Sequence, residues 1–116
     1  MDIVVTMPKN RWNEWLDEGD LPDEIYSGNR YFFSVGKRCP QSIHPGERVY
    51  IVSNEKLRGY APLLFIHNEW GYYYLVRGGC AVACTINQKI PGFRGFRYRF
   101  WEYSDEIPFT QNWRLL

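Results

Sequence analysis

The sequence lacks several features that mark particular classes of protein. It has only three cysteines in 116 residues, an odd number, and no Asn-X-Ser/Thr acceptor for N-glycosylation. Both features argue against a secreted scaffold held together by disulfides and favour reduced thiols. The composition likewise excludes collagen-like and disordered chains. We therefore expect one folded domain spanning residues 1–116, because a chain of this length can bury a core without stapling.

Long apolar runs are also missing. No stretch approaches the roughly 20 apolar residues that a membrane-spanning helix needs. The first ten residues have neither the basic flank nor the apolar length of a signal peptide. The phosphate-cradling pattern G-x-x-x-x-G-K is absent, as are C-x-x-C and H-x-x-x-H. These absences predict a cytoplasmic protein that has no membrane contact, no cofactor and no metal.

Aromatic residues, by contrast, are abundant. Five Trp, nine Tyr and seven Phe make up 18% of the chain, more than the core of a small domain requires. Some rings should therefore lie at the surface. Aromatic residues favour strands, and ten Gly and seven Pro punctuate the sequence, so a predominantly β domain is predicted.

Hydrophobic periodicity predicts the elements. A strand over 2–7 leads into a short amphipathic helix over 8–18, with Pro8 in its first turn and Gly19 after its end. Six further strands follow, and a Gly78-Gly79 turn should join two of them into a hairpin. Pro62 implies a bulge or edge position because it cannot donate to a ladder. The fold class is α+β: a small mixed or antiparallel β-barrel with one or two short helices. The six strands are expected over 30–35, 49–52, 57–66, 70–77, 81–86 and 96–101.

Charge is segregated along the chain although its net value is only +1. Residues 1–24 carry a net charge of −5, residues 25–101 carry +8 and residues 102–116 carry −2. No acid occurs between Glu69 and Glu102. Either this basic stretch faces an anionic partner, or the acidic N-terminal segment folds back onto it and neutralises it.

The segment from Ile43 to Ile51, with Pro45-Gly46-Glu47 entering a strand, and the following Arg58-Gly59-Tyr60 resemble the PUA-like superfamily, whose ASCH and EVE domains are most similar. The resemblance covers about residues 3–101. It implies a β-pseudobarrel whose cleft binds RNA or a modified base. The ASCH pattern G-x-K-x-x-E-x-R is not reproduced after Gly36, which speaks against ASCH-type catalysis, and no EVE-type pocket residues are carried over.

The region from Phe93 to Trp101 gives the most specific signal for binding. In a strand that alternates strictly, Arg97, Arg99 and Trp101 share one face, where guanidinium groups could bind phosphates while a base stacks on the indole. The alternative is a sheet whose aromatic side faces the core and whose arginines are merely solvated. We expect a basic, aromatic cleft formed by Arg58, Arg77, Arg94, Arg97, Arg99 and Trp101, bordered by Lys37 and Arg38.

Other candidate sites are weaker. Cys80 and Cys84 could join a histidine in a zinc site, but buried thiols that act as small apolar side chains explain the pair better. No neighbouring pattern marks either cysteine as a nucleophile. His67-Asn68-Glu69 could serve acid–base chemistry or form a polar loop.

Three functions therefore stay open. The first is a non-enzymatic module that binds RNA or another single-stranded or modified nucleic acid. The second is a small hydrolase acting on nucleic acid or a nucleoside, which requires a titratable residue with a shifted pKa in the cleft. The third is a protein-interaction or inhibitory accessory protein whose aromatic surface docks a partner.

Overall fold

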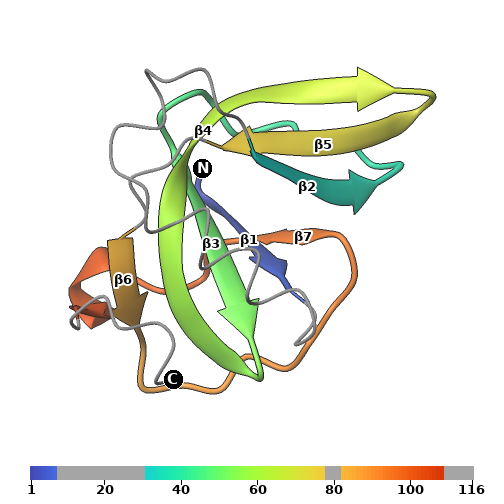
Figure 1. Cartoon of the computed structure of the whole chain (residues 1–116). Helices are drawn as coiled ribbons and strands as arrows, with labels where there is room; N and C mark the ends of the chain where they lie inside the picture. Colours follow the sequence, from blue (N-terminus) through green and yellow to red (C-terminus); the bar gives the residue numbers. More distant parts are fainter. Residues whose placement is uncertain (8–30, 78–81, 109–116) are drawn as a thin grey trace.

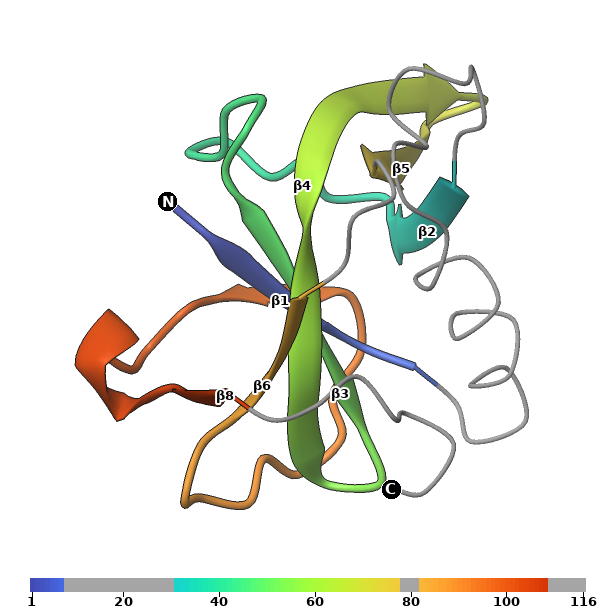
Figure 2. The ribbon, with the colours of Figure 1, turned by 60° about the vertical axis from the view of Figure 1, so that its left-hand side comes forward.

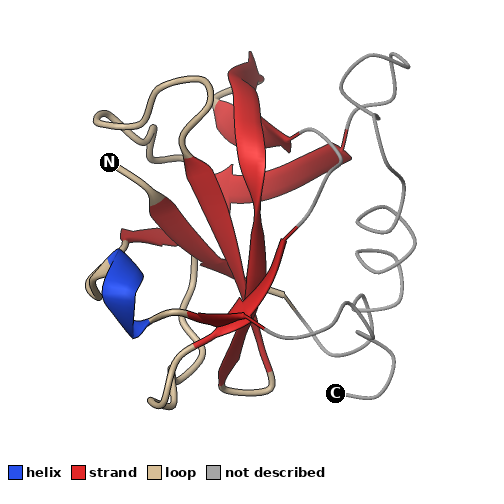
Figure 3. Ribbon diagram, turned by 90° about the vertical axis from the view of Figure 1, so that its left-hand side faces the viewer, coloured by secondary structure: helices blue, strands red, loops and turns tan. Residues whose placement is uncertain are grey.

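The computed structural model describes residues 1–7, 31–77 and 82–108. Strands dominate these ranges, with one short 3-10 helix (Figure 3). No helix in this part of the chain is long and apolar enough to span a membrane. The helix expected over 8–18 lies outside the described residues. The elements are β1 (Ile3–Thr6), β2 (Tyr31–Gly36), β3 (Arg48–Ser53), β4 (Lys56–Glu69), β5 (Tyr72–Arg77), β6 (Val82–Thr85), β7 (Phe96–Tyr98), η2 (Tyr103–Asp105) and β8 (Ile107–Pro108).

The strands form one curled sheet in the order β2-β5-β4-β3-β1-β7, and β6 pairs with both β4 and β8. β1 and β3 are parallel, whereas the other pairings are antiparallel. The sheet bends into a half-barrel (Figure 1). The predicted mixed β architecture is therefore confirmed at this coarse level.

β4 is the longest strand and links the two parts of the sheet (Figure 2). Its first half pairs with β3 and its second half with β5. Pro62 lies where the partners change, because the β6 pairing reaches only to Tyr60 and the β5 pairing begins at Leu63. A residue without an N–H is tolerated there because neither partner on that edge requires its hydrogen bond. The unusual position predicted for Pro62 is thus a junction between partner strands.

The expected hairpin between the 70–77 and 81–86 strands is wrong. β5 and β6 do not pair with each other, because both pair with successive parts of β4, on the edge opposite β3. They therefore lie one after the other along β4. Gly78 and Gly79 lie outside the described residues.

The central strands are buried on both faces, which explains their nearly continuous apolar sequences. In β1 and β3, Ile3, Val5, Val49 and Ile51 belong to a cluster on one face. Val4, Tyr50 and Val52 belong to a second cluster on the other face, which also contains Ile86, Ile90 and Trp101. The chain after β6 thus covers the second face of the sheet.

Candidate nucleic-acid groove

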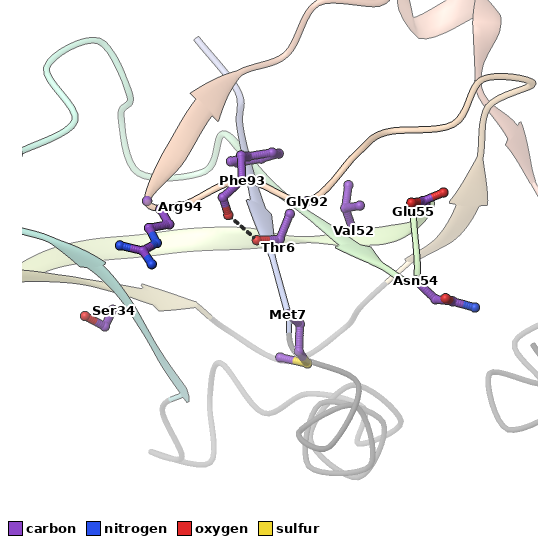
Figure 4. Close-up of a pocket in the computed structure, with 10 residues that line it drawn as sticks. Thr6, Met7, Ser34, Val52, Asn54, Glu55, Gly92, Phe93 and Arg94 are labelled. Carbon is purple, nitrogen blue, oxygen red and sulfur yellow. Dashed lines mark hydrogen bonds between the residues drawn. The ribbon is translucent and has the colours of Figure 1, made fainter.

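A groove lies between the end of β2 and the loop that precedes β7. It consists of two adjoining hollows, with volumes of about 540 and 480 Å³, which share Ser34, Arg94 and Gly95. One hollow extends toward the β3–β4 turn, and the other extends toward Lys37 and Arg38. Figure 4 shows the first hollow, in which the Arg94 side chain extends from its loop toward β2. The other residues that line the groove are Thr6, Met7, Val35, Gly36, Val52, Asn54, Glu55, Gly92, Phe93 and Phe96.

Hydrogen bonds hold the 90–96 segment in place at three points. Thr6 donates its hydroxyl to the Phe93 carbonyl at 2.7 Å, as Figure 4 shows. The Ile90 N–H donates to the Glu55 carbonyl at 2.9 Å, and the Arg38 Nη2 donates to the Phe96 carbonyl at 3.3 Å. The wall of the groove is therefore attached to β1, to the β3–β4 turn and to the residues that follow β2.

Gly95 allows the close approach of the two walls. Its φ of +75° favours glycine, and a Cβ at this position would lie 3.4 Å from the Val35 carbonyl oxygen. Gly36, with φ of +83°, ends β2 and turns the chain so that Lys37 and Arg38 line the groove. The backbone thus shapes the groove before any ligand is present.

Three of the eight predicted site residues line this groove and a fourth, Arg97, adjoins it; we call Lys37, Arg38, Arg94 and Arg97 the groove cations. Three of them line it directly. The Arg97 guanidinium instead lies 4.5 Å from the centroid of the Phe93 ring, which lines it. All four side chains are exposed, and none forms an ion pair with a carboxylate in the described parts of the chain.

The other four predicted residues do not reach the groove. Arg58 and Arg77 are buried, and the Arg58 Nε donates to the Ser53 carbonyl at 3.1 Å. The Arg99 Nε is 3.1 Å from the Asp2 carboxylate, so this arginine is neutralised by an N-terminal acid. The expected single cleft of eight residues is thus divided, because two of its arginines are buried in β4 and β5 and because β7 ends at Tyr98, before Arg99 and Trp101.

Trp101 requires a correction as a stacking surface. Its side chain is only 6% exposed and packs in the second core cluster. Its indole N–H donates to the Glu106 carboxylate at 2.9 Å. A base at the surface therefore has no access to this ring.

A second polar cluster surrounds Glu106. The Glu106 carboxylate accepts hydrogen bonds from Arg48 at 3.0 Å, from Tyr50 at 2.5 Å and from Trp101. Burial, followed by the hydrogen bond to Glu106, raises the pKa of Tyr50. The Arg48 guanidinium also lies over the rings of Tyr60 and Tyr103, 4.1 and 4.3 Å from their centroids. These groups already bind one another, so the cluster ties the C-terminal segment to the sheet.

The same cluster bears on cysteine chemistry. Burial, with the nearby Glu106 charge, raises the pKa of the Cys84 thiol to about 12. At neutral pH the thiol stays protonated, which makes it a poor nucleophile. In the described ranges no group of three His, Cys, Asp or Glu residues could hold a metal ion. Cys80 lies outside those ranges.

Sequence reasoning missed the polar groups in the first hollow. Thr6, Ser34 and Asn54 come from three strands or turns far apart in the sequence. Each stands at or near the end of an apolar strand, which is a weak signal shared by many structural residues. The pairing of β1 with β3 and the position of β2 bring them to one groove.

No family model, curated protein or solved structure matches this chain. The chemistry of the groove must therefore be judged from its own residues.

Proposed function

We propose that this protein is a binding module for single-stranded RNA or another single-stranded or modified nucleic acid, held by its phosphates at the groove cations. One observation carries the proposal. The groove cations are exposed and free of carboxylate partners in the described structure, whereas Arg48 and Arg99 pair with acids. Exposed cations that no acid of the described residues neutralises are available to an external anion.

The types of side chain in the groove suit a polynucleotide backbone. Guanidinium groups of Arg38, Arg94 and Arg97 match the geometry of phosphate oxygens. The Asn54 amide can donate to phosphates or sugars, and the Thr6 oxygen, whose hydrogen is donated to the Phe93 carbonyl, can still accept from a sugar hydroxyl. Among the described lining residues the one acid is Glu55, which lies in the hollow that Lys37 does not line, so phosphates should occupy the end formed by Lys37, Arg38 and Arg94.

We also propose that the fold is a PUA-like pseudobarrel. The mixed half-barrel supports this assignment, as does the turn at Gly46, whose φ of +89° leads the chain into β3. Cys39 and Cys84 are both free thiols, which supports a cytoplasmic location.

The test is binding of fluorescent 12-nucleotide single-stranded RNA and DNA, measured by anisotropy at low salt. The double variant R94Q/R97Q should bind about 10- to 100-fold more weakly, because each substitution removes one charge-assisted contact with a phosphate. The control is K89Q, which removes an exposed lysine outside the groove lining and should bind almost normally. Thermal melting should show that both variants stay folded.

Equal affinity of R94Q/R97Q and the wild type would contradict the proposal. A similar loss in K89Q would mean that net charge, and not the groove, governs binding.

A further inference from the structure

The tip of the β4–β5 hairpin presents a tryptophan to solvent. Glu69 and Tyr72 are direct partners in the sheet, so Trp70 and Gly71 form a two-residue loop. Their φ values of 55° and 79° fit a type I′ turn. The Trp70 side chain is 92% exposed, the most exposed large hydrophobic residue in the described structure.

This residue is a poor choice for the turn on grounds of folding alone. The first central position of a type I′ turn requires a positive φ, which Asn, Asp and Gly adopt most readily. Tryptophan has a bulky side chain that disfavours this conformation, and its indole is not buried here. A strained backbone that also exposes a large apolar ring is the kind of local cost that accompanies a binding role.

The hairpin tip is continuous with the cationic end of the groove. The Lys37 Nζ lies 5.6 Å from the centroid of the Tyr72 ring, and Tyr72 is 43% exposed. Lys37 also lines the groove together with Arg38. Figure 1 shows the β4–β5 hairpin projecting from the rest of the sheet on the same side as β2. A single-stranded nucleic acid that leaves the groove past Lys37 would therefore reach the tip of the β4–β5 hairpin.

We propose that Trp70 is a stacking platform for an unpaired base of the nucleic acid whose phosphates lie at the groove cations. This inference rests on the proposed function. Every base has an aromatic face, and stacking on an exposed indole needs no particular sequence. Lys37 beside Tyr72 supplies the positive charge that holds the neighbouring phosphate. Glu69, whose carboxylate lies 3.5 Å from His67, disfavours a phosphate directly at the tip and thus favours a base there.

The experiment separates stacking from charge. The variants W70N and W70F are compared with the wild type for binding of the same 12-nucleotide RNA and DNA, and of inorganic polyphosphate, which carries charge but no bases. W70N should weaken binding of both oligonucleotides about 5- to 100-fold and leave polyphosphate binding unchanged. W70F keeps a stacking ring and should retain most of the affinity.

Thermal melting gives an independent readout. W70N places Asn-Gly, the preferred type I′ pair, in the loop, so its melting temperature should be equal to or above that of the wild type. A loss of oligonucleotide affinity in a protein that is not destabilised excludes damage to the fold as its cause.

Three outcomes would overturn the inference. Unchanged oligonucleotide binding by W70N removes Trp70 from the site and leaves the groove proposal standing. Equal losses for oligonucleotide and polyphosphate would show that Trp70 acts on the groove and not on a base. A wild-type protein that binds neither the RNA nor the DNA overturns the proposed function, and the stacking role with it.

Discussion

Arginine residues of this protein have three different roles, which are set by where the sheet places each side chain. Arg77 is completely buried, Arg99 pairs with Asp2, and Arg94 faces the groove. Asp2 reaches Arg99 because β1 and β7 are antiparallel neighbours, with the Arg99 N–H donating to the Asp2 carbonyl at 3.0 Å. Asp2 and Glu106 pair with Arg99 and Arg48, whereas Arg94 has no carboxylate partner among the described residues.

The Asp2 carboxylate should contribute to stability in a pH-dependent way. Burial alone would raise its pKa, but hydrogen bonds from Tyr103, the Arg48 N–H and Arg99 outweigh burial and lower the pKa below its ordinary value of 3.8. D2N should reduce the free energy of unfolding at neutral pH by about 1–3 kcal/mol, because the acceptor loses its charge. Urea denaturation at a series of pH values measures this change.

The sign of the pH effect follows from the lowered pKa. The contribution of Asp2 is complete above the pKa of the unfolded chain and is lost as the pH falls through the folded-state pKa. The difference between wild type and D2N should thus be constant from about pH 5 to 7 and shrink below about pH 4. A difference that grows on acidification would refute this role for Asp2.

Individual side-chain roles could be predicted only in part from the sequence. The acid-free stretch pointed to Arg94 and Arg97, which form no ion pair among the described residues, but it could not show that Arg99 pairs with Asp2, 97 residues away. The alternation that ends in Trp101 looked like a surface face because local pattern does not show that the chain after β6 covers that face. The strand expected over 70–77 included Trp70, which was wrong, because Trp70 and Gly71 form the turn and β5 begins at Tyr72.

At the scale of elements, the β3–β4 turn has the same type as the Trp70-Gly71 turn between β4 and β5. The β3–β4 turn has Asn54 and Glu55 at φ of 54° and 62°, between the partners Ser53 and Lys56. Asparagine tolerates this conformation, whereas glutamate does so at a cost. The Glu55 carbonyl accepts a hydrogen bond from the Ile90 N–H, and a substitution of the Glu55 side chain would preserve this bond because both groups belong to the backbone.

E55G should therefore stabilise the protein. Glycine relieves the positive φ, and after allowing for its greater freedom in the unfolded chain we expect a gain of about 0.5–1 kcal/mol. The matched control is N54G, which should change stability little because Asn already suits the left-handed region. Destabilisation by E55G in urea denaturation would show that the Glu55 side chain makes a contribution larger than the strain.

Strand positions were easier to predict than strand partners. β1, β3 and β4 have local apolar patterns, and their approximate ranges follow from those patterns. The parallel β1–β3 pairing joins residues about 46 positions apart, so no local pattern reveals it. The Gly-Gly dipeptide suggested a hairpin after β5, but β4 is long enough to pair with both β5 and β6 along one edge. Strand length, more than turn chemistry, decided the topology.

At the scale of the whole molecule, the groove lies where the sheet does not close. β2 and β7 are the two ends of the six-strand path, and residues that adjoin each of them line the second hollow. Arg38 crosses this opening, with its guanidinium 4.5 Å from the centroid of the Phe96 ring and a hydrogen bond to the Phe96 carbonyl. A half-barrel thus leaves a groove at its open side.

The salt dependence of binding can distinguish this local groove from the charge of the whole molecule. With a net charge of only +1, a protein without a focused site should show little salt dependence. If the groove cations displace counterions from four phosphates of a single strand, the logarithm of the association constant should fall with the logarithm of salt concentration with a slope of about −3. Affinity should then drop about 50-fold between about 50 and 200 mM salt.

Each neutralised groove cation should reduce the steepness of this slope by about 0.7, so R94Q/R97Q should show about half of the wild-type dependence. K89Q should keep the full slope, because Lys89 does not line the groove. Anisotropy titrations at four or five salt concentrations measure all three slopes. A wild-type slope near zero, or equal slopes in all three proteins, would rule out phosphate binding at the groove, because counterion release is unavoidable wherever cations bind a polynucleotide.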